Sequence, residues 1–84
     1  MHLPEHPVTL TPERIAELNN ELSKMRHDIN NNLSVMVAAL ELIRLNPENA
    51  DRMLGNINQQ FGRIGENLGK FSAEFEKSLG ITRP

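Results

Sequence analysis

Hydrophobic residues recur at alternating steps of three and four along two long segments of this 84-residue chain. In the first segment they are Ile15, Leu18, Leu22, Met25 and Ile29, and the repeat continues through Asn32/Leu33, Met36, Ala39/Leu40 and Ile43. A repeat close to 3.5 residues predicts an α-helix that packs along one stripe against another helix. From Leu33 onward, apolar residues on both flanks widen the stripe, which indicates more than one neighbouring helix.

Both segments begin with a residue that caps helices, followed by proline and glutamate. These starts are Thr11-Pro12-Glu13 and Asn46-Pro47-Glu48. The first helix is therefore expected over residues 12–45 and the second over 47–79, ending at Gly80. The second repeats the three-four spacing at Ala50, Leu54, Ile57, Phe61, Ile64, Leu68, Phe71 and Phe75. A connection this short makes the two helices antiparallel neighbours.

The predicted fold class is all-α, an antiparallel two-helix hairpin over residues 11–80. A flexible N-terminal arm is expected at residues 1–10 and a tail at 81–84. Each helix would be about 50 Å long, so a lone hairpin leaves much of its apolar stripe in water. Two copies can cover it by forming a four-helix bundle, and we therefore expect a homodimer. The residues predicted to form the dimer core are Leu22, Met25, Ile29, Leu33, Met36, Ile57, Phe61, Ile64 and Leu68.

Composition and charge exclude several classes of function. Without cysteine the chain has no disulfide, no thiolate metal site and no cysteine nucleophile. The formal net charge of −2 argues against nucleic-acid binding, which usually needs a basic surface. No apolar run could span a bilayer or serve as a signal peptide, so we expect no membrane partner and a cytoplasmic location. His2 and His6 lie on the expected arm without an ordered third ligand, so we expect no metal site.

An unusual polar stretch lies in the middle of the first helix, where His27 and Asp28 are followed by Asn30, Asn31 and Asn32. Asn and Asp are poor residues for a helix interior, because their short side chains compete for backbone hydrogen bonds. The heptad that places Leu22 and Met25 in the stripe directs His27 away from it, so that the imidazole faces solvent.

Around His27 the same spacing gathers several polar side chains. Asn30, Asn31 and Ser34 lie on the same outer face and Lys24 one turn back, while Asp28 lies on the flank beside the imidazole. A neutral imidazole can act as a nucleophile, and the adjacent carboxylate can orient it or take up its proton. Two plainer interpretations stand beside this one. An exposed histidine is usually an ordinary surface residue, and Asn32, which lies in the stripe, can be a buried polar residue that sets the helix register.

Residues 26–36, with the sequence RHDINNNLSVM, resemble the H-box of sensor histidine kinases. In that family the H-box lies on the first helix of the dimerisation and histidine-phosphotransfer (DHp) domain, a helical hairpin that dimerises into a four-helix bundle. The resemblance covers roughly residues 12–79, and the second helix matches in pattern only. Asn32 departs from the family, which often has proline or an apolar residue at this position.

The resemblance implies a role for three residues. His27 corresponds to the phosphoacceptor, Asp28 to the adjacent acid that polarises it, and Asn31 to the position that orients water in kinases with phosphatase activity. Leu33 corresponds to the core leucine that closes the motif. The implied partners are a response-regulator receiver domain, which would carry its own Mg²⁺, and a separate kinase ATP-binding domain. We expect no cofactor to be bound by this chain itself.

The sequence shows no pattern typical of an ATP-binding domain, so we expect a phosphotransfer component rather than a complete kinase. Three interpretations remain open. The chain is a phosphotransfer protein that passes a phosphoryl group to or from a regulator aspartate, a structural, regulator-sequestering or phosphatase-type adaptor, or a piece of a larger kinase.

Glycines in the second helix raise a further alternative. Gly55, Gly62 and Gly69 lie seven residues apart, with Gly65 between them. Each costs the helix up to about 1 kcal/mol relative to alanine. They indicate either a tolerated, flexible helix or a smooth groove for a partner. Antiparallel pairing puts His27 level with residues 64–71, so Gly65 and Gly69 are the glycines expected to border such a groove.

Overall fold

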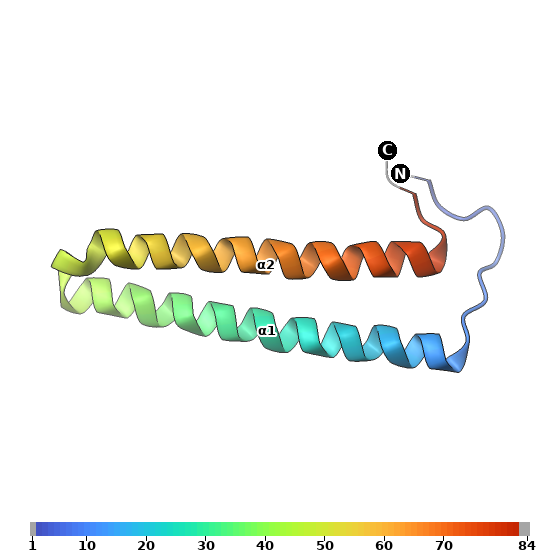
Figure 1. Ribbon diagram of the computed structural model, residues 1–84, viewed down its shortest axis with the longest axis horizontal. Helices are drawn as coiled ribbons and strands as arrows, with labels where there is room; N and C mark the ends of the chain where they lie inside the picture. Colours follow the sequence, from blue (N-terminus) through green and yellow to red (C-terminus); the bar gives the residue numbers. More distant parts are fainter. Residues whose placement is uncertain (1, 83–84) are drawn as a thin grey trace.

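The computed structural model describes residues 2–82. Helix α1 runs over Pro12–Leu45, a short 3₁₀ turn, η1, over Pro47–Asn49, and helix α2 over Ala50–Leu79. The two helices lie side by side and antiparallel, as Figure 1 shows, which confirms the predicted helical hairpin. The molecule is 57 Å long and 12 Å thick at its thinnest. Of the predicted arm and tail, Met1, Arg83 and Pro84 lie outside the described residues.

Local chemistry explains the helix ends. The Thr11 hydroxyl accepts a hydrogen bond from the Arg14 amide at 3.1 Å, which satisfies one of the free amides of the first turn. At the connection, the Asn46 side chain accepts from the Glu48 amide at 3.3 Å. Proline at position 47 thus starts a 3₁₀ turn, and the regular helix expected from 47 begins three residues later, at Ala50. Gly80 ends α2 with a φ of 69°, a left-handed conformation that favours glycine.

The contact between α1 and α2, called the seam below, is a thin core. Its buried apolar side chains are Leu18, Ala39 and Ile57. Half-buried residues extend it along both helices, including Leu22, Met25, Ile29, Met36, Ile64 and Phe71. A side-by-side pair of helices has no second layer, so few side chains are covered on all sides.

The open end of the hairpin is held by polar contacts. Arg14 on α1 donates from Nε to the Ser78 hydroxyl at 2.8 Å and from a terminal nitrogen to Glu74 at 2.9 Å, and it also pairs with Glu17. Hydrogen bonding to Glu74, and then to Glu17, raises the pKa of Arg14. His2 and Thr82 exchange two backbone hydrogen bonds, at 2.6 and 2.9 Å, so the N-terminal segment is joined to the chain just after α2.

Several large apolar side chains remain exposed on one continuous face. On α2 they recur every seven residues and so form a line along one side of the helix. The α1 residues also share one side of their helix, because the steps between them are close to whole numbers of helical turns. The members are Leu54, Phe61, Leu68 and Phe75 on α2 and Ile15, Leu33 and Leu40 on α1. We call this set the apolar face.

The predicted dimer core therefore divides between two places. Ile57 is buried in the seam, with Leu22, Met25, Ile29, Met36 and Ile64 half-buried, whereas Leu33, Phe61 and Leu68 are exposed on the apolar face. No helix within residues 2–82 is both long and apolar enough to cross a membrane.

Candidate functional site

His27 lies at mid-length on the outward side of α1 and is exposed. The side-chain amide nitrogen of Asn31, one turn further on, lies 3.4 Å from His27 Nε2. An amide N–H can only donate, so this contact is a hydrogen bond in the tautomer that carries its proton on Nδ1. At 3.4 Å the hydrogen bond is long and weak. Asn31 is thus the side chain that lies next to Nε2 of His27.

Asp28, the neighbour of His27, is half-buried on the flank of α1 that faces α2. Within residues 2–82 its carboxylate has no hydrogen-bond or ion-pair partner. It lines two hollows that follow one another along this flank. The carboxylate thus stands between the exposed imidazole and the space between the two helices.

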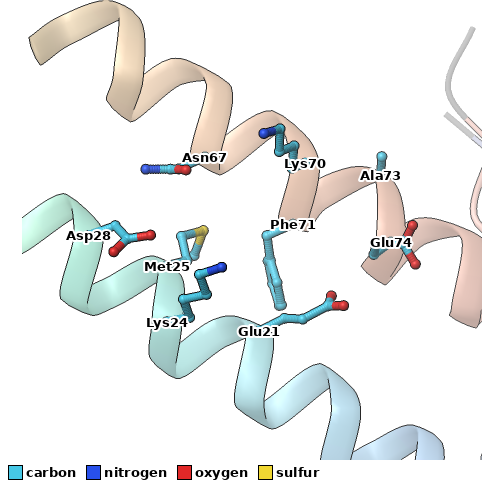
Figure 2. Close-up of a pocket in the computed structure, with 9 residues that line it drawn as sticks. All are labelled: Glu21, Lys24, Met25, Asp28, Asn67, Lys70, Phe71, Ala73 and Glu74. Atoms are coloured by element: carbon cyan, nitrogen blue, oxygen red, sulfur yellow. The ribbon is translucent and has the colours of Figure 1, made fainter.

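The larger hollow, a groove of about 490 Å³, lies between the two helices on the open-end side of Asp28. Figure 2 shows the Phe71 ring extending from α2 toward α1, with Lys24 to one side of it, Glu21 below and Lys70 above. The complete lining is Glu21, Lys24, Met25, Asp28, Asn67, Lys70, Phe71, Ala73 and Glu74. Both signs of charge border an apolar floor, which suits contact with a polar protein surface.

The smaller hollow, of about 280 Å³, is lined entirely by polar side chains. Asn31, whose side-chain amide contacts His27, is one of them, together with Asp28, Asn32, Arg63, Glu66 and Asn67. The candidate site is therefore the exposed His27–Asn31 pair at the rim of a polar hollow into which Asp28 and α2 also project.

The other predicted site residues lie in different places. Lys24 borders the larger groove, whereas Asn30 and Ser34 are exposed on the outer face near His27. The Ser34 hydroxyl donates to the Asn30 backbone carbonyl at 3.0 Å, a contact within the helix. Gly65 and Gly69 are exposed with open space beside their α-carbons, and neither lines one of the two hollows.

The α2 residues opposite the site are ones that the sequence analysis did not single out, namely Arg63, Glu66, Asn67 and Lys70. The antiparallel pairing had placed residues 64–71 level with His27. These residues could have been found from the polar side chains of that stretch that flank the seam, rather than from its glycines. Within residues 2–82, no three histidine, aspartate or glutamate side chains gather as a metal site.

Comparison of the chain with protein-family models, with curated proteins and with solved structures finds no match in any of the three.

Proposed function

We propose that this chain is a histidine phosphotransfer and dimerisation module of two-component signalling, in which His27 exchanges a phosphoryl group with a response-regulator aspartate. The observation that carries the proposal is the His27–Asn31 pair. Its imidazole is exposed at mid-length on a helical hairpin, has its Nε2 within 3.4 Å of the Asn31 amide nitrogen, and has a carboxylate on the adjacent residue. The likeness of residues 26–36 to the H-box adds to this geometry.

The transfer follows from ordinary nucleophilic chemistry. The Nε2 lone pair attacks the phosphorus of the regulator's aspartyl phosphate, and the bond from phosphorus to the carboxyl oxygen breaks with its electron pair on the aspartate. Asp28 accepts the proton that the ring carries on Nδ1, which leaves a neutral phosphohistidine. In the reverse direction the same groups return the phosphoryl group. The receiver domain brings the Mg²⁺ that this step needs, and a separate ATP-binding kinase domain is a further donor.

The homodimer in this proposal is supported by exposed area. The hairpin exposes 6468 Å², whereas a folded monomer of its 9.5 kDa mass exposes about 5,000 Å². The excess, roughly 1,400 Å², exceeds the ~800 Å² that each partner contributes to a standard interface. A second copy packed on the apolar face would cover it and leave His27, on the other side of α1, open to a regulator.

The test is phosphoryl transfer that depends on His27. The protein is incubated with phosphorylated receiver domains and, separately, with ATP and isolated kinase ATP-binding domains. We expect an acid-labile phosphoryl group that is absent in His27→Ala and present in the matched control His6→Ala, which removes a histidine from the N-terminal segment. A folded dimer that takes up no phosphoryl group from any donor would refute the phosphotransfer step.

The alternative function is a structural, regulator-sequestering or phosphatase-type adaptor without phosphotransfer of its own. The apolar face favours it, because dimerisation through that face requires no chemistry at His27. In this case His27→Ala leaves regulator binding and oligomeric state unchanged, while Phe61→Asp separates the dimer and Leu22→Asp, in the seam, disrupts the hairpin itself. A receiver domain that binds without exchanging label would identify the sequestering form.

A further inference from the structure

The middle of the seam contains three amide side chains instead of apolar ones. Asn32 is 9% exposed and Gln60 is 5% exposed, while Asn56 is half-buried. The Gln60 amide nitrogen donates to the Asn56 side-chain oxygen at 3.3 Å. The Gln60 carbonyl oxygen is buried and has no donor within the described residues. A buried acceptor without a donor lowers the stability of the fold, so we expect this oxygen to accept a hydrogen bond from a neighbouring side chain.

Asn32 is the donor that the hairpin geometry brings level with it. At the open end, Arg14 is bonded to Ser78 across the seam. In an antiparallel pair each step forward on α1 matches a step back on α2. Eighteen residues on from Arg14 is Asn32, and eighteen back from Ser78 is Gln60. The buried Asn32 side chain also makes no hydrogen bond to another described residue, so its amide is free to donate.

We propose that Asn32 and Gln60 form an amide pair across the seam, and that this pair sets the rotation of α1 about its own axis. The apolar pattern alone does not set this rotation of α1. Asn32 and Ala39 are buried, while the residues that follow them, Leu33 and Leu40, are exposed. Turning α1 by one residue, about 100°, would bury two leucines in their place. The amide pair opposes that turn, because Gln60 would then face Leu33 without any donor.

The rotation of α1 decides which side chains form the candidate site. His27 precedes Asn32 by five residues, which directs it about 140° away from the seam. Asp28 precedes Leu33 by the same five residues. If Leu33 replaced Asn32 in the seam, Asp28 would leave its groove for the outer face. The same turn would withdraw Leu33 and Leu40 from the apolar face. The amide pair is therefore a positioning device, and it does not depend on any chemistry at His27.

Thiol accessibility measures this rotation directly, because the chain has no cysteine of its own. Val35 and Val37 lie on opposite flanks of α1 and both are exposed, so a single cysteine at either one reports on its flank. A turn that carries Leu33 into the seam moves Val37 toward it and Val35 away from it. The measured quantity is the ratio of thiol labelling rates, Val37→Cys over Val35→Cys, in otherwise identical chains.

We expect Asn32→Ala to lower this ratio several-fold, since alanine at 32 removes the amide and adds no large apolar side chain that would hold α1 in its present rotation. Gln60→Leu tests the same pair from α2 and should act in the same direction. Asn20→Ala is the matched control: it makes the same change at an exposed position of α1 and should leave the ratio unchanged. Circular dichroism establishes that each variant is helical. An unchanged ratio in folded Asn32→Ala and Gln60→Leu overturns the proposal, whatever the outcome of the phosphotransfer assay.

Discussion

The dimer proposal is tested most directly at Phe61, one of the two middle residues of the exposed line on α2. This side chain is 57% exposed in the hairpin. With roughly 200 Å² of surface for a phenylalanine, about 110 Å² stays in water, and covering it stabilises by about 3 kcal/mol per chain. A symmetric dimer uses each such residue twice. If half of that area is covered, replacing Phe61 in both chains costs about 3 kcal/mol, or about a hundredfold in the dissociation constant.

The change to make is Phe61→Ala, with Phe61→Asp as the stronger form. Sedimentation equilibrium over a range of concentrations gives the dissociation constant, and circular dichroism shows whether the hairpin stays helical. Leu45 is the matched control, since it is also large, apolar and exposed, but lies at the end of α1 away from the apolar face. We expect Leu45→Ala to leave the dissociation constant within about twofold, the range of a surface change of ±0.5 kcal/mol.

Two outcomes would refute this reasoning. A wild-type chain that sediments as a helical monomer throughout the micromolar range would show that the apolar face is not self-complementary. A dimer that Phe61→Ala and Leu45→Ala weaken equally would show that the interface lies elsewhere.

Three further predictions concern single side chains. His27→Ala should abolish phosphoryl uptake while changing the unfolding free energy by no more than about 0.5 kcal/mol, because the side chain is exposed; calorimetry and acid-labile labelling check the two parts. Arg14→Ala should lower the melting temperature more than Arg44→Ala, and more at low salt, because Arg14 bridges the two helices whereas Arg44 pairs only within α1. Replacing Gly65 and Gly69 by alanine should stabilise the helix by up to about 1 kcal/mol each, because an added methyl group meets no other atom; denaturant unfolding measures this.

Each of these has an outcome that contradicts it. Phosphoryl uptake that persists in His27→Ala would place the acceptor on another residue. Equal melting temperatures for the two arginine variants would mean that the contacts to Glu74 and Ser78 contribute nothing across the seam. For the glycines, Gly80→Ala is the control: its left-handed φ makes alanine strained, so it should destabilise where the other two stabilise. Weaker regulator binding by the double alanine variant would support the groove interpretation of the glycines, and unchanged binding would exclude it.

The hairpin could be predicted from the sequence because the signals for helix starts and apolar sides depend on residues close together in the chain. A cap, a proline and a three-four repeat state where a helix begins and which side is apolar. The repeat does not say which apolar residues meet the other helix of the hairpin and which stay exposed, because both sets occupy one wide stripe. Ile57 and Phe61 illustrate this, since both continue the same repeat, yet Ile57 is buried and Phe61 exposed. The His2–Thr82 pairing joins segments at opposite ends of the chain, and no local pattern marks it.

The placement of Asn32 connects these observations. A polar residue in a seam lowers stability, so a chain selected only for a stable hairpin would place Leu33 inward. Placing Leu33 inward would bury the leucines that now lie on the apolar face, and it would turn Asp28 out of the groove. With Asn32 facing inward, α1 is rotated so that its surface has three distinct sides. The seam faces α2, the apolar face is exposed where the proposed second copy would pack, and the outer face presents His27 with Asn31 at its side. If this is correct, Asn32→Ala should turn Leu33 and Leu40 into the seam and strengthen the hairpin while weakening both dimerisation and transfer, a combination that loss of stability alone does not produce.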